Sequence, residues 1–306
     1  MRKALSLLLF VSAAASLHAQ NASPDQIRAA ATRAVAITQQ GSAGFYKFMT
    51  CFSCHDHALP VLEWQTARQH GVPVDETIAA QITAKGLLNT PNFTSIDDAV
   101  QDPGIIDPAP SDGWALVAAH AAGVLPNLVM AAYARRIATW QRPDGHWPTL
   151  DARPPQSYSL FTATAVAARA IQLYMPAQLR EETNSRLGRA KTWLLANEPQ
   201  STEDATFRLF GLRFTDATSG EIQRATAGLL ALQRADGGWG EIPHLPSDAY
   251  STGEALVALN EAGGVAVNDA AWRKGLQYLV STQGSRRGVA RAHAPSVARC
   301  GQPALF

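Results

Sequence analysis

Cysteine is scarce in this chain, with 3 residues among 306, too few for the disulfide framework of a small secreted domain. Excess charge is also lacking. The formal net charge is +1, so nothing in the composition favours a nucleic-acid or membrane-surface partner. No stretch reaches the run of about 18 apolar residues that a membrane-spanning helix needs, and we expect no membrane span. Hydrophobic residues still make up 46% of the chain, enough for a substantial core.

The first 19 residues have the pattern of a secretory signal peptide. Arg2 and Lys3 give a charged start, an apolar stretch covers residues 4–17, and a small residue, Ala19, follows. This order of charged, apolar and small residues predicts cleavage after Ala19. The mature protein is therefore expected in the periplasm or outside the cell.

Strand patterns are scarce as well. In their place, alanine-rich stretches carry apolar residues at intervals of three and four, the period of an amphipathic helix. Such stretches cover residues 116–122, 128–140, 162–174, 221–233 and 253–262. Loops that contain proline and glycine separate them. The sequence therefore predicts an all-α fold.

Two of these loops are nearly identical. "WQRPDGHWP" and "LQRADGGWG" both read Gln-Arg-x-Asp-Gly-x-Trp, and their glutamines, Gln141 and Gln233, stand 92 residues apart. Tyr158 and Tyr250, at the same separation, begin the helical pattern that follows each loop. Helical pairs at a fixed period predict a solenoid or a closed ring, in which each pair buries its apolar face against its neighbours.

The Gln-x-x-x-Gly-x-Trp pattern resembles the QW repeat of squalene–hopene cyclases and related prenyltransferase-type α/α-toroid proteins. The resemblance covers most of residues 30–283. It implies one α/α-toroid domain over residues 20–283, an incomplete barrel of helical hairpins with about half the length of a full cyclase. In that family the glutamine and tryptophan tie adjacent helix ends together. The resemblance implies this structural role for Gln141, Trp147, Gln233 and Trp239.

The motif "CFSCH" occupies residues 51–55. Two thiols three residues apart, followed at once by a histidine, have the spacing of a c-type haem attachment site. In such a site Cys51 and Cys54 would add across the haem vinyl groups, and His55 would bind the iron. Haem c is therefore the expected cofactor. The sequence does not identify a sixth iron ligand.

Other interpretations of the motif stay open. Cys51 and Cys54 could form a small structural disulfide beside a bystander histidine. The same cysteines together with His55 and His57 are potential zinc ligands, although neighbouring residues of one loop rarely close a tetrahedron. Thioredoxin-like redox chemistry is the weakest alternative, because no βαβ pattern accompanies the motif.

The motif is placed in the first repeat by the residues just before it. Gln40, Gly44 and Tyr46 have the spacing of the Gln-x-x-x-Gly-x-Trp pattern, and residues 59–70 take the place of the helix after the loop. We therefore expect residues 51–55 in the inter-helix loop of a degenerate first repeat, and not in a separate cytochrome domain.

The Asp-x-Asp-Asp motif, with which squalene–hopene cyclases protonate an alkene, does not occur in this sequence. The nearest match is "STED" (201–204), in which Glu203 would replace the catalytic acid and Ser201 the first carboxylate. Ser-x-x-Asp at a helix start is also an N-terminal cap, which is the interpretation we favour. The sequence thus leaves enzymatic activity undecided, with Glu203 as a weak candidate for the catalytic residue.

The repeat pattern stops after residue 283. Residues 284–306 contain four arginines, no acid and the third cysteine, Cys300. An irregular basic tail indicates disorder or an anionic partner, and a truncation or a loss of reading frame explains the change equally well.

Taken together, these patterns predict an exported c-type haem-binding protein with an electron-transfer or haem-based redox role and a redox partner. The alternative is a squalene cyclase-like enzyme, or a protein that binds a polysaccharide, an isoprenoid or some other apolar small molecule of the isoprenoid kind. In that case the CxxC would be a structural disulfide. No nucleic-acid partner is expected, and the oligomeric state is not indicated.

Overall fold

The computed structural model describes residues 22–48, 53–84, 107–150 and 158–284. In these ranges the chain forms eleven α-helices and no strand, which confirms the all-α prediction. The predicted signal peptide, residues 1–19, lies outside the described residues, as does the basic tail from residue 285 onward.

The helices follow one another along the chain, separated by connections of different lengths. They are α1 (Pro24–Phe48), α2 (Leu59–Gln69), α3 (Glu76–Thr83), α5 (Pro108–Ala121), α6 (Leu128–Thr139), α7 (Leu160–Tyr174), α8 (Arg180–Ala196), α9 (Thr202–Phe214), α10 (Ser219–Ala231), α11 (Ala249–Glu261) and α12 (Ala270–Thr282). A π-helical turn (Cys54–Ala58) precedes α2, and a 3-10 turn (Ala177–Leu179) precedes α8.

Helix starts are set by short polar side chains. Ser159, Ser201 and Asp248 precede α7, α9 and α11, and the side chain of each accepts a hydrogen bond from a backbone N–H of the first turn. Thr218 and Glu221 form a reciprocal capping box at the start of α10. These caps satisfy N–H groups that have no partner within the helix, so the local sequence determines where these four helices begin.

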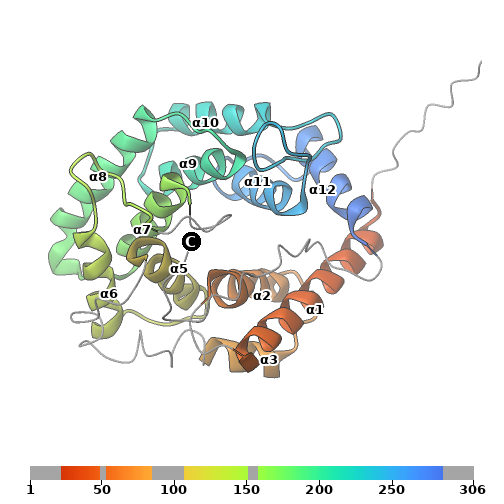
Figure 1. The fold of residues 1–306 in the computed structure, drawn as a ribbon, viewed down its shortest axis with the longest axis horizontal. Helices are drawn as coiled ribbons and strands as arrows, with labels where there is room; N and C mark the ends of the chain where they lie inside the picture. The colour runs from red at the N-terminus through yellow and green to blue at the C-terminus, as the bar shows by residue number, and fades with distance from the viewer. Residues whose placement is uncertain (1–21, 49–52, 85–106, 151–157, 285–306) are drawn as a thin grey trace, which may run out of the picture.

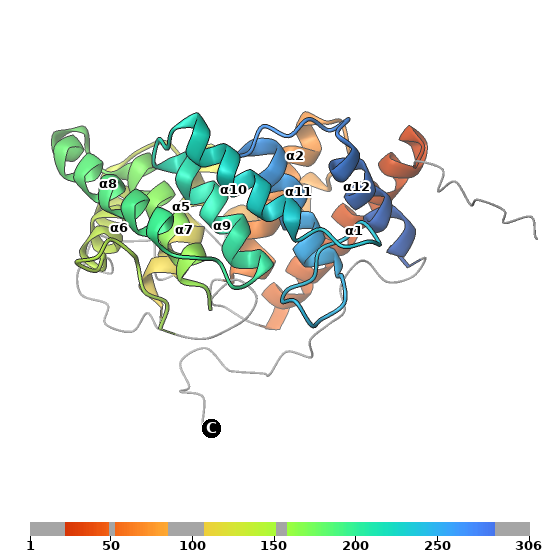
Figure 2. The same ribbon diagram turned by 90° about the horizontal axis from the view of Figure 1, so that it is seen from above.

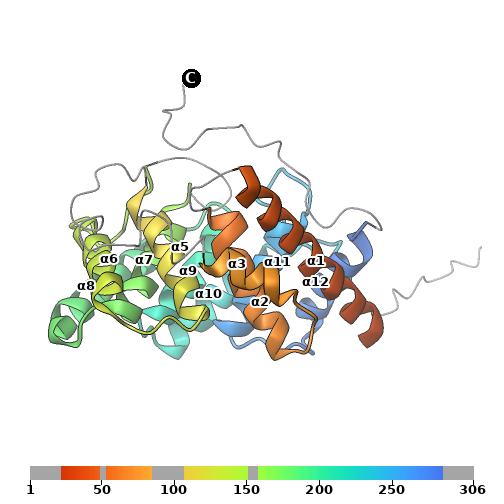
Figure 3. The ribbon, with the colours of Figure 1, turned by 90° about the horizontal axis from the view of Figure 1, so that it is seen from below.

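The helices form two rows (Figure 1). The inner row runs α2, α5, α7, α9 and α11, with each helix in contact with the next up to α11. The outer row packs against it: α6 contacts α5 and α7, α8 contacts α7 and α9, and α10 contacts α9 and α11. Figure 2 shows α10 beside α9 and α11, and Figure 3 shows α1 beside α12.

Small residues let the inner helices pack closely. Helix α7 lies between α5 and α9 and is buried on nearly every side, and five of its buried residues are alanines. Gly211 of α9 faces α8, where an added Cβ would lie 2.7 Å from Leu194 Cδ1. Because such interfaces have no room for large side chains on both partners, the alanine-rich composition is a packing requirement of this arrangement.

The first Gln-Arg-x-Asp-Gly-x-Trp loop follows α6 and is held in place by its own glutamine and tryptophan side chains. Gln141 Nε2 donates to the carbonyl of Gly145 at 2.9 Å and to the carbonyl of Arg186 in α8, also at 2.9 Å. The indole of Trp147 is fully buried, and its Nε1 donates to the carbonyl of Ile137 at 2.7 Å. The glutamine thus joins the loop to the next outer helix.

The second loop, after α10, repeats these hydrogen bonds. Gln233 Nε2 donates to the carbonyls of Gly237 and Ala271 at 2.8 Å each, and Ala271 belongs to α12. Trp239 is fully buried and its Nε1 donates to the carbonyl of Leu229 at 2.9 Å. The hydrogen bonds of both loops agree with the structural role expected for the two glutamine–tryptophan pairs.

The loop expected in the first repeat is absent at the predicted position. Gln40, Gly44 and Tyr46 all lie inside α1, which continues to Phe48, so that prediction was wrong. The segment lacks the Asp-Gly pair that forms a tight turn in the other two loops. The motif itself nevertheless lies between two helices, α1 and α2, as expected.

A different glutamine joins the first repeat to its neighbour. Gln39 is buried, its Nε2 donates to the carbonyl of Asp75 at 2.8 Å, and its Oε1 accepts from the N–H of Asp75 at 3.0 Å. Since Asp75 is the N-cap of α3, Gln39 links α1 to α3, much as Gln141 and Gln233 link loops to outer helices.

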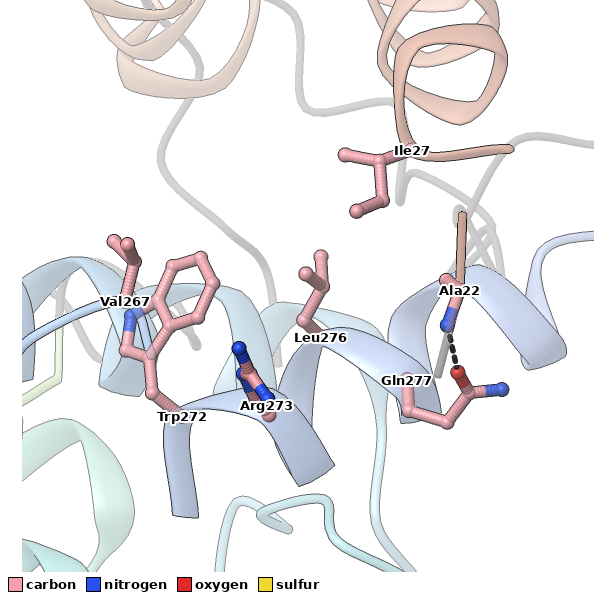
Figure 4. A pocket seen from close by; sticks show the side chains of 7 residues that line it. All are labelled: Ala22, Ile27, Val267, Trp272, Arg273, Leu276 and Gln277. Carbon is pink, nitrogen blue, oxygen red and sulfur yellow. Dashed lines mark hydrogen bonds between the residues drawn. The ribbon is translucent and has the colours of Figure 1, made fainter. Parts of the chain in front are cut away.

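The first and last helices meet along a seam. Gln283 accepts a hydrogen bond from Arg33 at 2.6 Å and donates to the carbonyl of Ala30 at 3.0 Å. Between α1 and α12 lies a cleft of about 460 Å³. Figure 4 shows Ile27 facing Leu276 across this space. The seam is therefore closed by polar side chains at its ends and is loosely packed in its apolar middle.

Candidate functional site

The described part of the CxxCH motif lies where α1 passes to α2. Cys51 lies outside the described residues, whereas Cys54 begins the π-helical turn. Ser53 is extended, and its hydroxyl accepts a hydrogen bond from the N–H of Asp56 at 3.2 Å, which caps the turn. The side chain of Cys54 is half-buried and packs against the core, while His55 is exposed.

His57 is directed the opposite way. It is 1% exposed, and its Nδ1 accepts a hydrogen bond from the N–H of Ser53 at 3.1 Å. The ring of Phe45 meets it edge-on at 5.6 Å between centroids. Burial lowers the pKa of His57 to about 4, so its imidazole is neutral at physiological pH and holds the turn against α1.

The two histidines therefore have different surroundings. His55 is open to solvent and His57 is enclosed by the core. In the part of the chain that the structure describes, no three histidine, cysteine, aspartate or glutamate side chains are placed to hold a metal ion. The disulfide alternative depends on Cys51, which is outside the described residues.

The donor set that is described suits a c-type haem. A haem thioether needs a thiol that the vinyl group can reach, and the iron needs an imidazole nitrogen with space beside it. Cys54 is partly accessible and the next residue, His55, is exposed. The described residues do not identify a sixth iron ligand.

A second group of polar side chains lies between the inner helices α7, α9 and α11, around Glu203. Ser201 caps α9 by accepting a hydrogen bond from the N–H of Asp204 at 3.0 Å, so the favoured cap interpretation of "STED" is confirmed. Glu203 itself is 0% exposed. Its carboxylate accepts hydrogen bonds from Thr162 Oγ1 at 2.6 Å and from the Tyr250 hydroxyl at 2.9 Å.

Glu254 lies beside Glu203. Both of its carboxyl oxygens are shielded from solvent and have no hydrogen-bond partner among the described residues. Burial raises the pKa of Glu203 to about 7. Burial, followed by the charge of Glu203, raises the pKa of Glu254 well above its usual value. Both carboxyl groups therefore favour the protonated form.

Glu241 completes the group from the loop before α11. The hydroxyl of Tyr158 donates to it, and the hydroxyl of Ser251 lies 3.4 Å away. Burial raises the pKa of Glu241, and the hydrogen bond from Tyr158 counteracts this in part. The sequence patterns did not indicate Glu241 or Glu254. For Glu254, the only signal in the sequence is an acidic residue within the apolar pattern of residues 253–262.

Tyr158 and Tyr250 are not structural equivalents, although they are 92 residues apart. Tyr158 precedes the N-cap of α7, whereas Tyr250 lies within the first turn of α11. The equivalent residues are Thr164 and Thr252, whose hydroxyls accept hydrogen bonds from the backbone N–H groups of the two loop tryptophans. The helix after the second loop therefore starts about one turn earlier relative to its tryptophan.

Comparison with known proteins found no protein-family model and no curated protein that matches the chain. Across the described ranges, none of the helices combines the length and apolar character needed to cross a bilayer.

Proposed function

We propose that the chain is an exported c-type haem protein with an electron-transfer or other haem-based redox role, built on a single α/α-toroid. The observation that supports haem attachment best is the contrast between His55 and His57. The histidine of the CxxCH spacing is exposed, while its neighbour two residues on is packed into the core. A porphyrin could therefore approach the motif without disturbing the fold.

The surrounding residues would hold the motif in place. The Ser53 cap and the buried His57 fix the turn that begins at Cys54. Cys51 and Cys54 would hold the haem covalently, and His55 would bind the iron. When bound, the haem would supply one-electron chemistry.

The toroid part of the proposal is supported by the two rows of helices and by the repeated loops. Each outer helix packs against neighbouring inner helices, and α1 returns to α12 (Figure 1). Gln141 and Gln233 make matching hydrogen bonds at corresponding points of the ring. The expected architecture of helical hairpins around a centre accounts for these contacts.

The cyclase-like alternative has weaker support. Glu203 is buried with a raised pKa, as a general acid requires, but it is 0% exposed. The clefts of about 460 and 180 Å³ are not lined by Glu203. A fully buried acid whose carboxylate accepts hydrogen bonds from Thr162 and Tyr250 is better explained as part of the folded core.

Haem attachment is tested by expressing the protein in the periplasm together with a c-type haem maturation system. We expect a visible haem spectrum and haem that stays with the polypeptide on a denaturing gel. Cys54→Ser should lose or weaken this attachment, and His55→Ala should keep it with a shifted spectrum.

Matched controls separate these effects from general damage. Cys300→Ser and His244→Ala change a cysteine outside the motif and an exposed histidine far from it in sequence, and both should leave the spectrum unchanged. A colourless wild-type protein that folds normally would refute the haem proposal.

A further inference from the structure

Acidic side chains converge between the starts of α7, α9 and α11, three inner helices that lie in sequence along the ring (Figure 1). Glu203 comes from α9, Glu254 from α11 and Glu241 from the preceding loop. Among the described residues, no lysine or arginine donates a hydrogen bond to any of these three carboxyl groups. The group is thus rich in acids, and the described part of the chain supplies no base that hydrogen-bonds to it.

Glu203 connects the three helices. Thr162, which donates to one carboxylate oxygen at 2.6 Å, belongs to α7, and Tyr250, which donates to the other at 2.9 Å, belongs to α11. Since Glu203 is fully buried, these contacts are shielded from water and are correspondingly strong. One carboxyl group therefore joins neighbours on both sides of α9.

The surroundings of Glu254 indicate its protonation state in the folded protein. Neither of its oxygens reaches solvent, and its polar neighbours are the carboxyl group of Glu203 and the hydroxyl of Tyr250. An ionised carboxylate in that position would lose its hydration and face a second acid, whereas a neutral carboxyl group loses much less. The geometry is therefore that of a protonated Glu254.

We propose that Glu203 and Glu254 form a proton-dependent clamp between α9 and α11, which holds the starts of α7, α9 and α11 together when neutral and loosens them when ionised. This role would make the stability of the ring sensitive to pH in the compartment where the protein works. It does not depend on haem attachment.

The direction of the pH dependence follows from the pKa values. Burial raises the pKa of Glu203 to about 7, and that of Glu254 is raised well above its usual value, again mainly by burial. The folded chain therefore keeps protons that the unfolded chain has already released. The clamp's contribution is complete at low pH and is lost as pH rises through about 7.

The other groups around the pair act in both directions, because hydrogen bonds from Thr162 and Tyr250 lower the pKa of Glu203 and partly offset the effect of burial. The charge of Glu241 further raises the pKa of both glutamates. The facing side chain of α7 is a hydroxyl, which carries no charge. The titratable groups around the carboxyl groups are Tyr158, Asp204, Glu241, Asp248 and Tyr250. None of these can supply a positive charge to replace the proton.

The test compares urea unfolding of the wild type with Glu203→Gln at several pH values. Glutamine keeps the shape of glutamate but cannot titrate. Between about pH 5 and about pH 7, the unfolding constant of the wild type should rise relative to the variant by up to about tenfold per pH unit. The buried His57 titrates in the opposite sense, but it is present in both proteins and cancels in the ratio.

Glu181→Gln is the matched control, because Glu181 is an exposed carboxylate on α8. The ratio of the wild-type unfolding constant to that of Glu181→Gln should not vary with pH. If the corresponding ratio for Glu203→Gln is equally constant, the clamp proposal is overturned.

A second measurement covers the case in which Glu203→Gln does not fold. Infrared spectra of the wild-type protein should show the carbonyl band of a buried, protonated carboxyl group at pH 6, with loss of intensity by pH 9. Amide exchange at the starts of α9 and α11, corrected for its intrinsic pH dependence, should accelerate over the same range. The absence of the protonated band at pH 6 would refute the proposal.

Discussion

The glycine of the second repeated loop offers the sharpest test of the repeat packing. Gly237 has φ +88°, a backbone conformation that side chains rarely adopt. A Cβ at this position would lie 2.7 Å from the carbonyl oxygen of Lys274 and 3.0 Å from its carbonyl carbon. These are backbone atoms of α12, so the obstacle cannot rotate away. Gly237→Ala therefore combines backbone strain with a collision between the loop and an outer helix.

The expected cost follows from the two effects. A side chain held in an unfavourable φ region costs about 1–3 kcal/mol, and overpacking a close contact costs about 1–3 kcal/mol more. We therefore expect Gly237→Ala to lower the free energy of unfolding by about 2–6 kcal/mol. Gly145→Ala in the first loop should cost at least as much, because its φ is +112° and its Cβ would lie 2.3 Å from the Arg189 carbonyl oxygen.

Gly228→Ala is the control. Gly228 lies in the interior of α10, has no atom within 4 Å of an added Cβ, and does not have a positive φ. Alanine should stabilise this helix by about 0.5–1 kcal/mol. The assay is urea unfolding followed by far-ultraviolet circular dichroism. If Gly237→Ala unfolds within about 0.5 kcal/mol of the wild type, the tight contact between loop and helix is not a feature of the folded protein.

Two further predictions concern buried ionisable side chains. Asp112 is 1% exposed and pairs with Arg136 at 2.8 Å, so Asp112→Asn should lower the free energy of unfolding by about 3–5 kcal/mol in urea, whereas Glu76→Gln in an exposed pair should change little. Equal effects of both would contradict the burial argument. Since burial lowers the pKa of His57 to about 4, stability should fall by up to about 3 kcal/mol as pH drops from about 6.5 to about 4. His57→Gln should flatten this dependence in urea titrations, and an unchanged slope would show that another group titrates.

The structure also corrects one prediction that was based on the spacing of the repeat. Gln40, Gly44 and Tyr46 match the spacing of the repeated loops, yet they continue α1 without a break. Spacing alone does not end a helix. The Asp-Gly pair that supplies the tight turn at Gly145 and Gly237 is missing from this segment.

The sequence by itself was sufficient for the features that depend on neighbours along the chain. The three- and four-residue periods predicted the helices, Ser201 in "STED" predicted a cap, and the Gln-Arg-x-Asp-Gly-x-Trp loops predicted equivalent joints. Each of these is a local interaction, or a local pattern repeated, so its physical cause can be read within a few residues.

Only the tertiary structure brought Glu203, Glu241 and Glu254 together and separated the exposed His55 from the buried His57. These outcomes depend on which face of each helix its neighbours cover, and the groups that meet around Glu203 come from segments more than 40 residues apart. Burial and proximity then shift the carboxyl groups toward their protonated forms. No pattern within a single segment carries that information, because the low-dielectric surroundings are created by other parts of the chain.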